Sequence, residues 1–162
     1  MTKLLRCLRV DASDERVFPR AAAPGEWAIP GAFAFADAEP GEMTRQQRQA
    51  FANGFLGLES FGWSTLVTVA EITPERLDQL IEALAERLLN EFGAPSRAEA
   101  VAAAREEIDF AASLCHHPLN TLLALERTFD DDIIREKFRV VEPPRDKPHA
   151  RIWNIVADDD KN

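Results

Sequence analysis

Hydrophobic positions recur with two different periods along the chain, and the clearest change of period lies within residues 64–92. Residues 64–72 form a short apolar run rich in β-branched side chains, which predicts a central strand. Thr73 then supplies a helix-capping oxygen, Pro74 suits the first helical turn, and Glu75 places negative charge at the positive end of the helix dipole. A strand that leads directly into a long helix is therefore the predicted scaffold of the fold.

Three helices are predicted from apolar stripes and capping signals. The helix that starts at Pro74 has one apolar face, formed by Leu77, Leu80, Ile81, Leu84 and Leu88. A capping box that begins at Ser96 opens the second long helix, which Pro118 ends. Its inward stripe consists mainly of small side chains: Val101, Ala104, Ile108, Ala111 and Cys115. A further capping box at Thr44 predicts a short helix that stops near Asn53 and Gly54.

A hairpin with a defined register is predicted around Asp131 and Asp132. If these two residues form its tip, residues whose numbers sum to 263 face each other. Leu125 then meets Phe138, and Arg127 meets Glu136 on the core face. A slip by one residue would place Leu125 opposite Lys137, so the patterning favours this register. Asp-Asp is a poorer tight turn than Asn-Gly, and a four-residue loop of the same register is equally compatible.

The remaining apolar segments complete a predicted α+β fold. Strands are expected at residues 4–10, at residues 32–36, where Phe33 and Phe35 would lie on one surface, and at residues 150–157. Val17 and Phe18 could begin a short strand that Pro19 stops. We predict a mainly antiparallel sheet of five or six strands, two long helices packed on one face and a short extra helix. Residues 1–157 would form one domain, and residues 158–162 an acidic, frayed tail.

Composition narrows the functional classes. The formal net charge of −9 disfavours nucleic-acid binding, which needs a basic surface. No apolar run approaches the ~20 residues of a membrane span, and the N-terminal apolar run is too short for a signal peptide. The two cysteines, Cys7 and Cys115, lie far apart and match no metal-binding spacing, which is typical of a reducing compartment. A cytoplasmic protein is the expected result.

Side chains with catalytic or metal-binding chemistry are sparse. His116 and His117 form a weak candidate metal site, but the HExxH, ExxH and CxxC spacings are absent. Histidines that cap the end of a helix are the favoured interpretation. Cys115 lies on an inward helical stripe, where a cysteine is usually an inert buried residue, and no phosphate-binding or dinucleotide-binding glycine motif is present. We predict no cofactor and assign no catalytic residue.

The segment that these rules leave unexplained is residues 53–63, in which three glycines alternate with large apolar side chains. Such a segment lets the backbone approach another group closely. Trp27, Phe55 and Trp63 could line an apolar pocket or a partner-binding groove, with Glu59 fixing a polar group. The alternative, that these aromatic residues are packed core, is favoured because aromatic side chains dominate protein cores.

Two stretches of the sequence, residues 25–31 and residues 49–62, resemble a family of short bacterial proteins described only as a domain of unknown function. The resemblance continues through residues 104–108 and 149–153. It implies a bacterial, cytoplasmic, stand-alone domain, and it implies no activity, substrate or cofactor.

Two functional hypotheses follow. The first is a non-enzymatic accessory or protein-interaction domain that binds a partner protein or another copy of itself. The second is a small enzyme or ligand carrier that uses the aromatic, glycine-rich pocket of residues 55–63 for a small molecule, or a metal site at His116 and His117.

Overall fold

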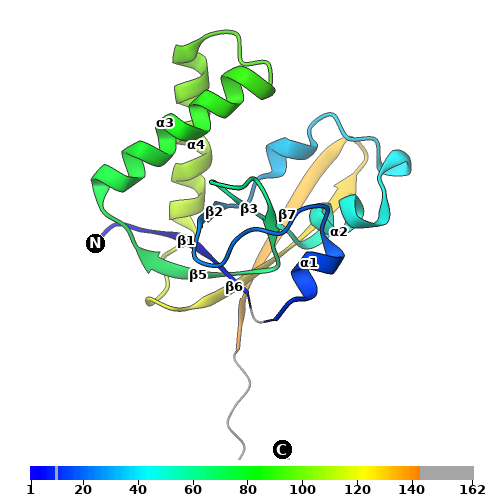
Figure 1. The fold of residues 1–162 in the computed structure, drawn as a ribbon, viewed down its shortest axis with the longest axis horizontal. Helices are drawn as coiled ribbons and strands as arrows, with labels where there is room; N and C mark the ends of the chain where they lie inside the picture. Colours follow the sequence, from blue (N-terminus) through cyan, green and yellow to red (C-terminus); the bar gives the residue numbers. More distant parts are fainter. Residues whose placement is uncertain (10, 143–162) are drawn as a thin grey trace, which may run out of the picture.

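The computed structural model describes residues 1–9 and 11–142. Its main feature is a curled, antiparallel sheet of seven strands in the order β4-β3-β2-β1-β5-β6-β7 (Figure 1). The strands are β1 (Lys3–Leu8), β2 (Trp27–Ile29), β3 (Phe55–Gly57), β4 (Trp63–Ser64), β5 (Leu66–Glu71), β6 (Leu122–Asp130) and β7 (Ile133–Val141). The predicted α+β class is confirmed, with more strands than the five or six expected.

The helices are α1 (Ser13–Val17), α2 (Arg45–Asn53), α3 (Pro74–Glu91) and α4 (Arg97–Ser113). Two 3₁₀ helices, η1 (Ala32–Phe35) and η2 (Pro40–Glu42), lie between β2 and α2. The hydroxyls of Thr44, Thr73 and Ser96 cap the three longest helices at their N-termini, as predicted.

The two long helices lie together on the same side of the sheet (Figure 1). Helix α4 packs on β1 and β2, whereas α3 packs mainly on α4. The prediction that both helices cover one sheet face is therefore corrected in detail, because α3 is held to the sheet largely through α4. The small buried side chains Ala100, Ala104 and Ala111 of α4 permit this close packing.

The strand predicted at residues 32–36 is wrong, because the segment forms the 3₁₀ helix η1. Gly31 adopts a left-handed conformation with φ of 83°, and its carbonyl accepts a hydrogen bond from the backbone N–H of Ala34. The two rings consequently point to different clusters. Phe33 packs against Phe92, and Phe35 packs against Phe51. Alternation of large and small residues was here a property of a tight helix and not of a strand.

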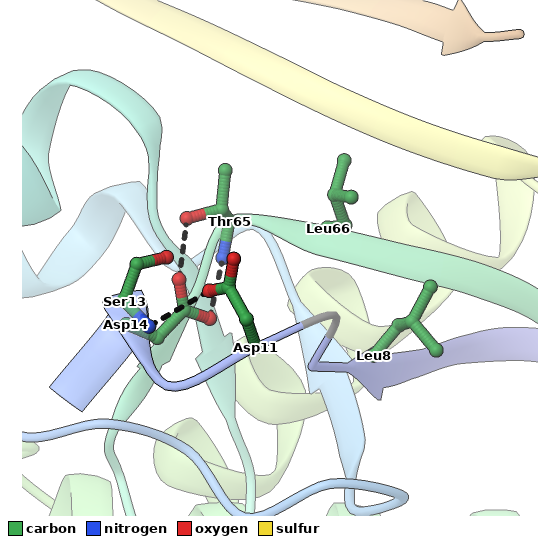
Figure 2. A pocket seen from close by; sticks show the side chains of 6 residues that line it. All are labelled: Leu8, Asp11, Ser13, Asp14, Thr65 and Leu66. Carbon is green, nitrogen blue, oxygen red and sulfur yellow. Dashed lines mark hydrogen bonds between the residues drawn. The ribbon is translucent and has the colours of Figure 1, made fainter. Parts of the chain in front are cut away.

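The short strand predicted at Val17 and Phe18 is also wrong, since residues 13–17 form helix α1. Helix α1 places Asp14 against the start of β5, where its carboxylate accepts hydrogen bonds from the N–H and the hydroxyl of Thr65 (Figure 2). The chain bends at this point, so the strand predicted for residues 64–72 is divided into β4 and β5. A small hollow of about 130 Å³ adjoins this contact.

The hairpin of β6 and β7 has the predicted register. Leu125 faces Phe138, Arg127 faces Glu136, and Asp130 faces Ile133. The tip is the two-residue turn and not the four-residue loop. Asp131 adopts φ of 58° there, a conformation that Asp tolerates better than most residues.

The core lies inside the curl of the sheet and beneath α4. It includes the fully buried Leu4, Leu5, Ile29 and Phe55. Among residues 1–9 and 11–142, no helix is both long and apolar enough to cross a membrane. The strand predicted at residues 150–157 and the tail predicted at residues 158–162 lie outside the described residues.

Candidate functional site

The glycine-rich stretch of residues 53–63 wraps around the buried carboxylate of Glu26. One carboxylate oxygen accepts the backbone N–H groups of Glu59 and Ser60 at 2.9 and 3.0 Å. The other accepts the Ala23 N–H at 2.6 Å and the Ser60 hydroxyl at 2.8 Å. Four donors thus satisfy a carboxylate that is only 4% exposed. Glu26 fixes the turn between β3 and β4 and was not singled out from the sequence.

Close approach explains two of the glycines. A Cβ atom at Gly57 would lie 2.3 Å from a Glu26 carboxylate oxygen, and one at Gly62 would lie 2.5 Å from the Ala21 backbone. The prediction that this backbone approaches another group closely is confirmed, and the groups approached belong to the chain itself.

The four residues predicted to form a ligand or partner site occupy two environments. Trp27, Phe55 and Trp63 are buried in the core. The Glu59 carboxylate is exposed on the turn and forms an ion pair with Arg76 at 3.0 Å. The three aromatic residues are therefore buried but do not form one cluster, since Trp63 packs against Phe35 and Phe55 lies near Phe138. The Glu59 side chain lies at the surface, on the turn that Glu26 holds.

An aromatic cluster lies at the surface of the same turn. The rings of Phe33, Phe61 and Phe92 pack with centroid separations of 5.2 to 6.4 Å. Phe61 adopts φ of 56°, which is unusual for a bulky residue, and the Arg87 guanidinium lies 4.1 Å from its ring centroid.

Arg127 is the central buried polar residue. Its guanidinium donates to the carbonyls of Phe51 and Gly54 at 3.0 and 2.9 Å, and also to the Pro30 carbonyl. It forms an ion pair with Glu136 at 2.8 Å, as the hairpin register predicted. Burial lowers the pKa of the Arg127 guanidinium, and the neighbouring Glu136 carboxylate opposes that shift. The carbonyls of Phe51 and Gly54 lie at the end of α2, and the Pro30 carbonyl lies just before η1. Arg127 therefore ties the hairpin to both segments.

Glu107 of α4 belongs to the electrostatic surroundings of this ion pair. Burial raises the pKa of the Glu107 carboxyl, and the negative charges of Glu136 and Glu106 raise it further. Arg127 acts in the opposite direction.

The remaining sequence candidates lie at the end of α4. The rings of His116 and His117 have centroids 4.2 Å apart, and His116 Nδ1 lies 3.2 Å from the Ser113 carbonyl. Within residues 1–9 and 11–142, no three His, Cys, Asp or Glu side chains are grouped closely enough to hold a metal ion. Burial raises the pKa of the Cys7 thiol to about 12 and that of Cys115 to about 11, which disfavours the reactive thiolate.

A groove lies between the η1–η2 segment and the tip of the β6–β7 hairpin. It consists of two adjoining hollows of about 480 and 300 Å³ that share Phe35, Ala38 and Glu39. Its apolar lining includes Phe35, Phe129, Ile134 and Met43. Its five carboxylates are Asp37, Glu39, Glu42, Asp131 and Asp132, and no basic residue of the described part of the chain lines either hollow. We call this feature the acidic groove.

Sequence patterns alone did not identify the acidic groove. Its two sides are nearly one hundred residues apart, and each had a local explanation as a turn or a strand. Two short acidic segments, residues 37–42 and 130–132, are the available signal. Their proximity depends on the curl of the sheet.

Comparison with known proteins places the chain in a family and supplies no activity. No curated protein and no solved structure matches the sequence. A family model described as a family of unknown function, DUF6505, matches residues 1–154. Because the match covers nearly the whole chain, the protein belongs to this family of unknown function.

Proposed function

We propose that this protein is a non-enzymatic binding domain that takes a basic, amphipathic segment of a partner protein into the acidic groove. The observation that supports this most strongly is the combination of five carboxylates and an apolar lining, with no lining cation among residues 1–9 and 11–142. A concave surface of this size matches the usual dimensions of a ligand site. Lysine or arginine side chains of a partner would meet the acidic rim, and its apolar side chains would meet Phe35 and Ile134.

The rigid support beneath the groove is consistent with a binding role. Phe129 stacks on Phe51 of α2 with ring centroids 4.2 Å apart. Arg127 anchors the end of the same helix through the carbonyls of Phe51 and Gly54. A preformed surface of this kind loses little conformational entropy on binding. We place this function in the cytoplasm of a bacterium, consistent with two buried free thiols.

Fluorescence anisotropy with two labelled synthetic peptides tests the proposal. One peptide carries lysines among leucines and the other carries glutamates at the same positions. We expect only the lysine peptide to bind, with an affinity that falls as salt rises. The double variant Asp37→Asn/Asp132→Asn should weaken that binding roughly tenfold, because each rim charge contributes about 1 kcal/mol or less in water.

The matched control is Asp78→Asn/Asp109→Asn, which removes two exposed aspartates from α3 and α4. It should leave the affinity for the lysine peptide unchanged. Equal binding of both peptides, or an equal loss in both double variants, would contradict recognition by the groove. Purification of the native protein as a monomer with no bound partner would argue against an interaction role more generally.

A further inference from the structure

The outer edge of β7 is long and regular. All nine residues of β7 pair with β6 without a bulge, and the strand contains no proline. Among residues 1–9 and 11–142, no strand pairs with its other side. In an antiparallel pair every second residue turns its backbone N–H and C=O groups away from the neighbouring strand, so this edge presents a row of hydrogen-bonding groups. Folded proteins usually keep edge strands short or interrupt them, because such rows pair with other chains.

The two faces of β7 differ in chemistry. The face toward the core carries Phe138 and the exposed Val140. Phe110 of α4 is exposed beside them, with its ring centroid 5.8 Å from that of Phe138. The opposite face carries three exposed bases, Arg135, Lys137 and Arg139. A strand that fits this edge therefore needs apolar side chains on one face and carboxylates on the other.

Two of the three bases can pair with an added strand. Arg135 already forms an ion pair with Asp130 of β6 at 2.7 Å. Glu126 of β6 lies directly opposite Lys137, yet within the described part of the chain neither Lys137 nor Arg139 forms an ion pair with a carboxylate. Carboxylates of an added strand would therefore meet two cations beside the edge.

A second copy of β7 does not meet this requirement. Antiparallel pairing of two copies about Lys137 would place the two Lys137 side chains opposite each other and Arg135 opposite Arg139. A shift by two residues would place Arg135 opposite Lys137 and Glu136 opposite Glu136. Like charges directly across a strand pair are destabilising. The basic face of β7 thus disfavours self-pairing of this edge.

We propose that the outer edge of β7 binds an extended segment of a partner protein as an added antiparallel strand. The segment alternates apolar side chains, on the face of Phe138, with carboxylates, on the face of Lys137 and Arg139. Backbone hydrogen bonds supply the affinity, and the alternating side chains supply the specificity. This partner site is independent of the acidic groove, which residues 135–141 do not line.

Fluorescence anisotropy of a labelled peptide with the whole protein tests the proposal. The peptide alternates valine and glutamate, with threonine in place of the residue opposite Glu136, whose carboxylate is already paired with Arg127. Its β-branched valines favour an extended chain, unlike the leucines of the peptides used for the acidic groove. We expect the wild-type protein to bind this glutamate peptide, and to bind a copy with glutamine at each glutamate position about tenfold more weakly.

A charge reversal tests the basic face. Lys137→Glu/Arg139→Glu should weaken binding of the glutamate peptide by at least about tenfold, because attraction becomes repulsion at both positions. The matched control is Arg16→Glu/Arg105→Glu, which changes the net charge equally at two exposed arginines of α1 and α4. The control should leave the affinity within about twofold of wild type. Equal affinities in the two double variants would overturn the proposal.

Backbone methylation tests whether the peptide pairs with the edge. Two further versions of the glutamate peptide are N-methylated, one at each alternate set of residues. Only one set of N–H groups faces β7 in an added strand, so only one version should lose binding to the wild-type protein. Loss in both versions or in neither would overturn the proposal, and so would no binding of the unmodified peptide at about 1 mM. Asp37→Asn/Asp132→Asn, which alters the acidic groove, should not weaken binding of the glutamate peptide.

Discussion

At the scale of single residues, the structure depends on buried charges that are fully hydrogen-bonded. Arg127 joins the β6–β7 hairpin to the end of α2 and to the segment before η1, and Glu26 holds the turn between β3 and β4. A buried ion pair is weak support for net stability, but loss of one partner leaves the other charge uncompensated. The two residues therefore differ from the surface ion pairs, which contribute little.

Arg127→Met should lower the free energy of unfolding by about 3–5 kcal/mol, because Glu136 and several carbonyls would lose their donor. Urea denaturation followed by circular dichroism measures this change. The double variant Arg127→Met/Glu136→Gln should recover part of the loss. Arg135→Met removes an exposed ion pair with Asp130 and should cost less than about 1 kcal/mol. Equal losses in Arg127→Met and Arg135→Met would contradict the structural role of Arg127.

Glu107 should give stability a specific pH dependence. Its folded-state pKa is raised by burial and by neighbouring carboxylates, so the folded protein binds this proton more tightly than the unfolded chain. The charged Glu107 carboxylate therefore lowers the free energy of unfolding. This loss is absent below the ordinary glutamate pKa of about 4.3 and develops as pH rises through the higher folded-state pKa. Glu107→Gln should therefore stabilise the protein near pH 7 relative to wild type, and the difference should shrink towards pH 4. Thermal unfolding at a series of pH values measures it, and a difference independent of pH would contradict this origin.

At the scale of elements, the β3–β4 turn shows a position where the space beside the backbone, and not side-chain chemistry, requires glycine. Gly62 passes against the Ala21 backbone, whereas a Cβ atom at Gly41 of η2 would meet no atom within 4 Å. Neither glycine has positive φ, so the two positions differ in available space and not in backbone conformation.

Gly62→Ala should destabilise the protein by about 1–3 kcal/mol, because the added methyl group must displace backbone. Gly41→Ala, the control, should change stability by less than about 1 kcal/mol in either direction. Chemical denaturation of both variants provides the comparison. Similar values for the two would show that the approach of Gly62 to Ala21 is not limiting.

At the scale of the whole molecule, both cysteines are enclosed by the fold. Their thiol pKa values of about 12 and 11 keep them protonated at neutral pH. Ellman's reagent at pH 8 should react slowly with the native protein and rapidly with two thiols after denaturation. A fast reaction of one native thiol would indicate local opening near β1 or the end of α4.

The acidic groove also belongs to this scale, since it combines the η1–η2 segment with the hairpin tip, which are distant in sequence.

Much of the fold could be predicted from local patterns. Capping residues located α2, α3 and α4, and apolar stripes identified the buried faces of α3 and α4. The β6–β7 register followed from pairing of apolar and charged residues, including Arg127 with Glu136. These predictions succeeded because each feature depends on interactions within one element or between adjacent elements.

The tertiary structure alone decided the short strands and the candidate site. β2, β3 and β4 have two or three residues each, too few for a period to be recognised, and their pairing depends on β1. Alternating Phe and Ala in η1 satisfied a strand pattern, yet the Gly31 turn and two separate aromatic clusters selected a 3₁₀ helix. Glu26 became important only when β2 and the β3–β4 turn met around its carboxylate, and the acidic groove arose only when the sheet curled. Sequence by itself thus determined the helices and the hairpin register, because local hydrogen bonding and periodic burial specify them. Contacts between distant segments determined the short strands and the position of the candidate site.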